Sequence, residues 1–375
     1  MKISFPRFPM HAKKWLILDL LGGVAGVLGG LGAVVLHLMI ETINHLFFNL
    51  LLPHISFHIS GYNLSIILLP LIGGLIVGPL VTKFAPETRG HGIPEVMEAV
   101  ALKAGYIRKR VAFLKVLVSA ITIGSGGSAG REGPIAQTGS AIGSSLAQIF
   151  KLEPDDAKLL VVCGLSAGIA GAFNAPLGGA LFGMEVLLRG IGLFNAMPVI
   201  IASVVGAAVA SSFLGEKPAF SAEGLTSWSP PELILYAILG LVFGIISVLW
   251  VKSFYAIEDV FERLKISPTY KPALGGLATG FLILLLPEHG IMGVGYEGVN
   301  KALAGELFLI LLLTLGILKM IATSCTVGSG GSGGIFAPSL YIGAMFGAAM
   351  GLLFSFAFPS IADQPFTYAL AGMAA

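Results

Sequence analysis

The stretch Gly124-Ser-Gly-Gly-Ser-Ala-Gly-Arg-Glu-Gly-Pro134 decides the fold of this chain. It lies between two apolar runs. It returns at 328–338 as Gly-Ser-Gly-Gly-Ser-Gly-Gly-Ile-Phe-Ala-Pro, identical at seven of eleven positions with an offset of 204 (328 minus 124). The shared order of Ser, Gly and Pro, with apolar flanks of the same kind, indicates an internal duplication.

The composition around these stretches is that of an integral membrane protein. Of the 375 residues, 55% are apolar and 11% are charged, whereas soluble domains carry about 25% charged residues. Most apolar runs have roughly 15 to 25 residues, enough for helices that cross a bilayer. Because they lack alternation with a period of two, they are not barrel strands. We expect an all-α polytopic membrane protein in which some helices are short or interrupted.

The repeat predicts how the chain is divided. The first repeat covers 1–213, a Pro- and Ser-rich linker covers 214–231, and the second repeat covers 232–375. Counterparts of roughly 169–213 are missing from the second repeat, so we expect a truncated chain. Three basic regions, the first of them the N-terminal segment, are predicted to face the cytoplasm. The location predicted is the inner (plasma) membrane of a bacterium.

Glycine spacing predicts which helices pack closely. Gly26 and Gly30 lie in the first apolar run, and Gly240 and Gly244 match them in the second repeat with a shift of 214. Small residues at such spacings allow helices in a membrane to approach each other. Cys163 and Cys325 are expected to be buried thiols rather than a disulfide.

Several helices are predicted to begin inside the membrane. The candidates begin near Pro94, Pro134, Pro338 and Pro176, because proline favours the first turn of a helix. The free amides of such a helix start have no water to bind and carry about half a positive charge, which suits an anion. Glycines before the helix let the backbone form a concave nest around that anion.

Glu132 is the unusual residue of these helix starts. An ionised carboxylate there fills the site of an anion, whereas a protonated one is free to leave, so Glu132 is predicted to be a pH-linked gate. The plainer alternative is a helix-capping glutamate paired with Arg131. Carboxylates inside membranes are usually functional, which favours the gate.

Three ordered motifs resemble the anion-pathway signatures of the CLC family of chloride channels and chloride/proton antiporters. They are Gly-His-Gly-Ile-Pro-Glu at 90–95, Gly-Arg-Glu-Gly-Pro at 130–134 and Gly-Ile-Phe-Ala-Pro at 334–338, with Asn-Ala-Pro-Leu-Gly-Gly at 174–179 between them. The resemblance implies an all-α fold with an inverted repeat and broken, re-entrant helices, and a homodimer with one pore per subunit. It also implies Glu132 as the gating glutamate, and an anion site. The predicted anion-binding residues are His91, Gly92, Ile93, Arg131, Gly133, Gly334, Ile335, Phe336 and Ala337.

Three departures from the family pattern bear on function. His91 replaces the usual serine, and it either donates to the anion or merely faces the cytoplasmic vestibule. Branches selective for other anions, fluoride among them, also lack this serine, so chloride is the default expectation. Glu185 aligns with the first member of the Glu-Glu pair of antiporters and Val186 with the second, which carries the inner proton. The tyrosine that completes the site in relatives would lie beyond Ala375, and neither Tyr296 nor Tyr368 is at the matching position.

Because Val186 cannot carry a proton, the sequence leans towards a voltage- or pH-gated chloride channel. The alternative is an antiporter that exchanges chloride, or another anion such as fluoride, for protons. Glu185 is a possible part of a proton path but more often structural. A third possibility is an anion sensor or scaffold that passes no ions.

Other functional classes find little support. The glycine stretches lack the Lys-Ser/Thr ending of a phosphate-binding loop, so an enzyme is not expected. His37, His45, His54 and His58 do not have metal-ligand spacing and are expected at an outer surface. We expect no metal, no cofactor apart from bound chloride, and no nucleic-acid partner. The expected partners are a small anion, protons and membrane lipid.

Overall fold

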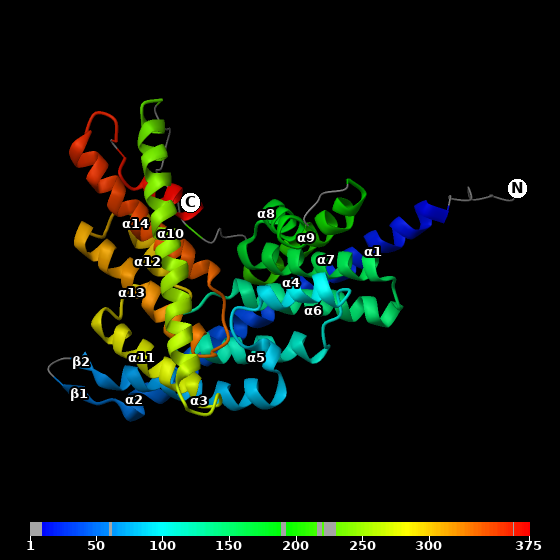
Figure 1. The fold of residues 1–375 in the computed structure, drawn as a ribbon, viewed down its shortest axis with the longest axis horizontal. Coiled ribbons are helices and arrows are strands. Elements are labelled where there is room, and N and C mark those ends of the chain that lie inside the picture. Colours follow the sequence, from blue (N-terminus) through cyan, green and yellow to red (C-terminus); the bar gives the residue numbers. More distant parts are fainter. Residues whose placement is uncertain (1–9, 60–61, 189–192, 216–219, 221–229, 363) are drawn as a thin grey trace, which may run out of the picture. The chain divides into compact units, whose positions relative to one another are not determined.

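The computed structural model describes residues 10–59, 62–188, 193–215, 220, 230–362 and 364–375. Two compact units interleave along the chain (Figure 1). Unit 1 comprises Met1–Leu36, Ile93–Val116 and Ile135–Lys217. Unit 2 comprises His37–Gly92, Leu117–Pro134 and Pro218–Ala375. The predicted division into two successive repeats is a different partition that stays a prediction, and much of the linker 214–231 lies outside the described residues.

Helices form nearly all of the described structure. The first group is α1 (Met10–Asn44), η1 (His45–Leu51), α2 (Leu52–Ile55), η2 (Leu64–Ile67), α3 (Leu68–Phe84), η3 (Pro86–Thr88), α4 (Ile93–Leu102), α5 (Arg110–Gly124), α6 (Glu132–Phe150), α7 (Pro154–Phe173), α8 (Pro176–Gly183), η4 (Met184–Leu188) and α9 (Leu193–Leu214). The second group is α10 (Glu232–Arg263), α11 (Lys271–Leu285), α12 (Tyr296–Leu303), α13 (Leu309–Gly328), α14 (Phe336–Ala357) and α15 (Thr367–Ala374). A short antiparallel pair, β1 (His58–Ile59) and β2 (Tyr62–Asn63), joins α2 to η2.

Seven helices of the described chain are long and apolar enough to cross a membrane. They are mixed with much shorter ones, such as α8 and α12 with eight residues each. At a rise of 1.5 Å per residue, eight residues span only about 12 Å. The predicted all-α membrane fold with broken helices is confirmed.

In unit 1, α1 packs on α9 through glycines. A Cβ added to Gly26 would lie 2.8 Å from the carbonyl oxygen of Ala202, and one added to Gly30 would lie 2.6 Å from that of Gly206. The predicted close packing at these glycines is confirmed. Their matches in the repeat, Gly240 and Gly244 of unit 2, differ, because an added Cβ there would meet no atom of the described residues within 4 Å. Equal spacing in the sequence does not ensure that a neighbouring helix is present.

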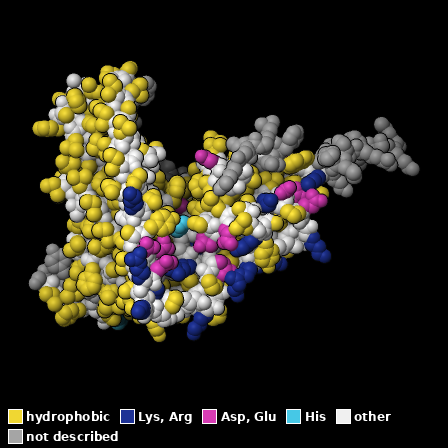
Figure 2. Space-filling model, viewed as in Figure 1, with side chains coloured by type: hydrophobic (Ala, Val, Ile, Leu, Met, Phe, Trp, Pro, Cys, Tyr) yellow, Lys and Arg dark blue, Asp and Glu magenta, His cyan; other side chains and the backbone are white. Residues whose placement is uncertain are grey.

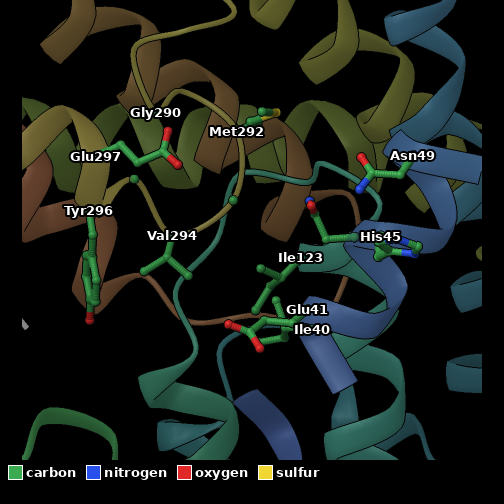
Figure 3. A pocket seen from close by; sticks show the side chains of 13 residues that line it. Ile40, Glu41, His45, Asn49, Ile123, Gly290, Met292, Val294, Tyr296 and Glu297 are labelled. Atoms are coloured by element: carbon green, nitrogen blue, oxygen red, sulfur yellow. The ribbon is translucent and has the colours of Figure 1, made fainter. Parts of the chain in front are cut away.

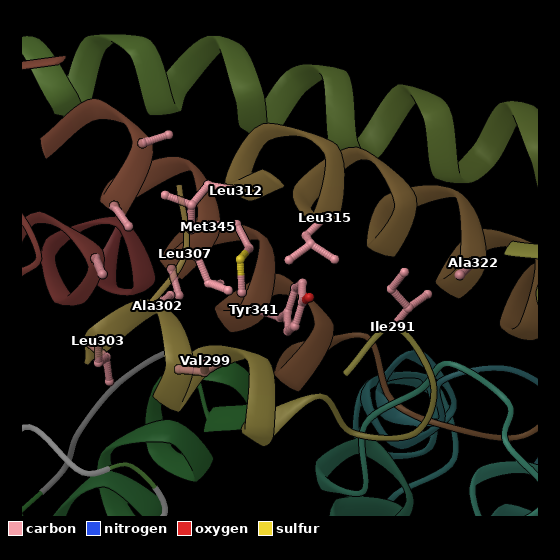
Figure 4. Packing of buried hydrophobic residues seen from close by; sticks show 14 of the residues in the cluster. Ile291, Val299, Ala302, Leu303, Leu307, Leu312, Leu315, Ala322, Tyr341 and Met345 are labelled. Carbon is pink, nitrogen blue, oxygen red and sulfur yellow. The ribbon is translucent and has the colours of Figure 1, made fainter. Parts of the chain in front are cut away.

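The core of unit 2 lies among α12, α13 and α14. Leu315 from α13 and Tyr341 and Met345 from α14 are fully buried and face residues of α12 (Figure 4). Beside this core, α3 crosses α11 at glycines: an added Cβ on Gly276 would overlap the backbone of Pro70. In unit 2, α12, α13 and α14 therefore pack through aliphatic and aromatic side chains, whereas α3 and α11 pack backbone against backbone at glycines.

The surface of unit 2 matches a lipid environment. Exposed apolar side chains cover α10, with Leu241 75% and Ile245 65% exposed, and Figure 2 shows hydrophobic atoms over much of this helix. Apart from Glu232 at its first position, its charged residues lie in the C-terminal part, from Lys252 onward. Both cysteines are buried and free, as predicted.

Candidate functional site

The two glycine stretches fold into the same backbone shape within unit 2. Gly126 has φ of 104° and its counterpart Gly330 has φ of 103°, a left-handed conformation that glycine adopts without strain. The amide of Gly127 donates to Thr122 O at 2.9 Å, and the amide of Gly331 donates to the equivalent Thr326 O at 3.2 Å. Residues that are 204 positions apart therefore form the same hydrogen bonds, in addition to being of the same type.

The stretches also bind each other reciprocally. The amide of Gly130 donates to Gly334 O at 2.7 Å, and the amide of Gly334 donates to Gly130 O at 2.6 Å. The amide of Ser128 donates to the hydroxyl of Thr326, and the amide of Ser332 donates to the hydroxyl of Thr122. When equivalent residues exchange the same bonds, a local two-fold axis relates them, as an inverted repeat requires.

A third and a fourth segment extend this symmetry. Gly90 accepts from Gly333 and donates to Gly331, and Gly293 accepts from Ala129 and donates to Gly127. Both glycines have positive φ, 71° for Gly90 and 58° for Gly293. Four loops from distant parts of the chain thus meet at one place, and their backbone groups bond to one another.

Glu132 begins α6 at the centre of this arrangement. Its side chain is 1% exposed, and Oε1 accepts a hydrogen bond of 2.7 Å from the hydroxyl of Tyr296. Oε2 is buried and has no hydrogen-bond partner among the described residues. A Cβ added to Gly130 would touch Oε2 and would lie 3.1 Å from the amide nitrogen of Ala337. The carboxylate therefore lies at the start of α14, where the helix carries its positive end.

Arg131 joins Tyr296 to the end of α1. A guanidinium nitrogen of Arg131 lies 2.7 Å from Nδ1 of His37, and Nε2 of His37 lies 3.1 Å from the carboxylate of Glu41. Because a guanidinium only donates, Nδ1 accepts and Nε2 carries the proton that faces Glu41. The same guanidinium lies 5.4 Å from the centre of the Tyr296 ring. The outer-surface role predicted for His37 omitted this contact with the neighbour of Glu132.

Lys319 holds the loop that leads to Tyr296. It is fully buried in α13, and Nζ donates to Gly290 O at 2.9 Å, to Ile291 O at 3.1 Å and to Gly293 O at 3.0 Å. An ammonium group has three donors, so this loop uses all of them. The 290–293 loop is thereby tied to α13 in the same unit as the Glu132 carboxylate.

A cavity of about 360 Å³ opens beside these groups in unit 2. Glu41, His45 and Asn49 line one side of it, and residues 290 and 292–297 line the other (Figure 3). The side chain of Tyr296 points away from that of Glu297 in this view. The cavity gives small solutes access to the loop that carries Tyr296.

Unit 2 brings together most of the predicted site residues. The carbonyl of His91 and the Cα of Gly334 both lie against Gly133, and Ala337 lies against Gly130. Gly92 follows His91, Arg131 follows Gly130, and Ile335 follows Gly334 in the chain. Phe336 is the first residue of α14. The ring of His91 packs edge-on to Phe254, with 6.2 Å between ring centres. Ile93 and Glu185 belong to unit 1, and their roles remain predictions.

A family model described as the voltage-gated chloride channel matches residues 73–375. The chain belongs to the CLC family. Among its curated CLC relatives is the H⁺/Cl⁻ exchange transporter ClcA of Yersinia pestis bv. Antiqua (strain Angola), 35% identical over 301 residues. The match covers 79% of this chain and 63% of that relative, so the chain spans less than two thirds of its length.

Solved CLC structures have the same fold. A slow cyanobacterial Cl⁻/H⁺ antiporter superposes with a TM-score of 0.83 at 28% identity, covering 99% of this chain and 85% of the other. A CLC-type fluoride/proton antiporter superposes with a TM-score of 0.78 at 23% identity, covering 98% and 88%. The second likeness concerns the fold alone.

Two residues of this arrangement, Tyr296 and Lys319, are not predicted from the sequence. Tyr296 does not match the CLC tyrosine expected past Ala375, yet its hydroxyl donates to Glu132. Lys319 was overlooked within an apolar run. A lysine amid apolar residues of a predicted span was the available signal, because charges inside membranes are usually functional.

Proposed function

We propose that this protein exchanges chloride for protons across a membrane, with Glu132 as the group that alternates between them. The observation that supports this most is the position of the Glu132 carboxylate at the start of α14, buried and bound on one oxygen only. An anion suits the same place, because free amides and the positive end of a helix favour negative charge. The named exchange transporters among the relatives support protons as the second substrate.

The proposed cycle follows from competition between two negative charges. While ionised, the Glu132 carboxylate fills the start of α14 and excludes chloride. Chloride entering the site displaces it, and the displaced carboxylate takes up a proton from the solution outside. When chloride leaves, the carboxylate returns and its proton is released to the other side. At each step about one negative charge, on either chloride or the carboxylate, lies against the helix start. The free-energy difference between the two states therefore stays small.

The test is a measurement of the reversal potential in liposomes that contain purified protein, with symmetric chloride and a proton gradient. Coupled exchange shifts the reversal potential away from zero. Glu132→Gln, which keeps the shape of the side chain and removes its charge, is expected to abolish that shift. A zero reversal potential in the unaltered protein would refute exchange, and a shift that survives Glu132→Gln would remove Glu132 from its role.

A gated chloride channel is the second candidate function. Val186 supports it, because the resemblance puts the inner proton-carrying glutamate of antiporters at this position and valine carries no proton. The preference for a channel drawn from the sequence is not confirmed by the comparisons, whose named exchangers fit the antiporter better. The reversal potential distinguishes the two.

We further propose that the protein works as a homodimer with one pathway per subunit, in the inner membrane of a bacterium and with its N-terminus in the cytoplasm. The exposed apolar side chains along α10 suit contact with lipid or with a second copy. The basic N-terminal segment supports the orientation. Crosslinking in native membranes tests the dimer, and accessibility of an N-terminal tag in sealed vesicles tests the orientation.

A further inference from the structure

Tyr296 is held in place before it reaches Glu132. It is the first residue of α12, directly after Gly295, whose φ of 93° turns the chain into the helix. The three bonds donated by Lys319 fix the loop ahead of that turn. The guanidinium of Arg131 lies over the ring of Tyr296, and the ring of Phe220 packs edge-on at 4.8 Å. These contacts leave the hydroxyl little freedom to move.

The hydroxyl uses this fixed position to bind one oxygen of Glu132. The distance of 2.7 Å is typical of a bond from a hydroxyl to a carboxylate. Oε2 has no hydrogen-bond partner among the described residues, whereas the bond from Tyr296 restrains Oε1. Leaving the start of α14 therefore requires that the bond between Tyr296 and Glu132 break.

We propose that Tyr296 is a positioning residue that retains the ionised Glu132 carboxylate in the anion pathway and so sets the pH at which the pathway opens. This inference rests on the proposed function. A hydroxyl that donates to a carboxylate stabilises its ionised form, so removing the hydroxyl favours the protonated form. The pathway of a variant without this hydroxyl opens at higher pH.

Other charged and titratable groups surround the pair and stay in place in such a variant. Arg131 adjoins Glu132 in the chain, and Lys319 is buried in α13. From the end of α1, His37 reaches Arg131 and Glu41 reaches His37. Further groups are His91, whose carbonyl lies against Gly133, and Glu297, which follows Tyr296.

The experiment compares Tyr296→Phe with Tyr341→Phe. Each removes one hydroxyl and keeps the ring, but the hydroxyl of Tyr341 donates to His289 O at 2.6 Å and not to Glu132. Chloride efflux from liposomes is measured against external pH. The pH of half-maximal efflux is expected to rise by about one unit in Tyr296→Phe, the effect of one bond to a charged group. It is expected to stay unchanged in Tyr341→Phe.

Two further measurements keep the inference testable on its own. In a Glu132→Gln background, Tyr296→Phe is expected to cause no further change in efflux. Infrared difference spectra follow protonation of the carboxyl, assigned by its loss in Glu132→Gln, and need no transport. If the protein moves no chloride, the spectra still report the shift. An unchanged titration in Tyr296→Phe, or an equal shift in Tyr341→Phe, would overturn the inference.

Discussion

Replacing Lys319 by methionine tests whether this buried lysine holds the 290–293 loop. The change removes the lysine donor from the carbonyls of Gly290, Ile291 and Gly293, of which Gly293 keeps the bond from the amide of Ala129. A buried acceptor left unpaired costs about 1–3 kcal/mol. Burial of the lysine is itself unfavourable and is relieved by methionine, so the lower end applies to the other two carbonyls and the net loss is about 2 kcal/mol.

The assay is thermal unfolding of the purified protein in detergent. A loss of this size lowers Tm by about 2–3 °C in a chain of this length. Lys319→Arg is the matched control, because arginine keeps the positive charge and several donors, and it is expected to lose much less. A Tm for Lys319→Met within about 1 °C of the unaltered protein would refute the reasoning, because two carbonyls that lose their donor cannot be free of cost.

Two other predictions follow from glycine packing and from the ring of His91. Gly276→Ala is expected to destabilise the protein by about 1–3 kcal/mol, since its Cβ overlaps the backbone of Pro70. Gly240→Ala, with open space at the same atom, is expected to be neutral or to stabilise α10 by up to about 1 kcal/mol; equal effects on unfolding would contradict the packing. His91→Ser removes the edge-on contact with Phe254 and is expected to cost about 1 kcal/mol while the chloride-to-fluoride flux ratio stays the same. A changed ratio would mean that the imidazole reaches the anion.

The parts of the fold that could be read from the sequence are those set by local chemistry. Composition showed the membrane, and the glycine stretches showed where helices break, because a nest of free amides needs glycine at fixed positions. The offset of 204 was sufficient to predict a repeat, and the bonds exchanged by Gly130 and Gly334 carry the same offset.

The contacts that could not be predicted from the sequence are those between segments that lie far apart in the chain. Tyr296 lies 164 residues from Glu132 along the chain, and nothing in its own neighbourhood indicates that its hydroxyl meets a carboxylate. Gly240 repeats the spacing of Gly26 but has no helix against it. Spacing reports the face of a helix on which a residue lies, whereas the partner of that face is decided by the whole fold.

The reciprocal bonds between the glycine stretches bear on how the molecule distinguishes one side of the membrane from the other. The two stretches look alike from either end, so their shared backbone alone gives the site no direction. Within and beside them the copies differ at positions such as Glu132 opposite Phe336 and His91 opposite Val294. In the exchange proposed above, side chains of this kind distinguish the two sides of the membrane at the site.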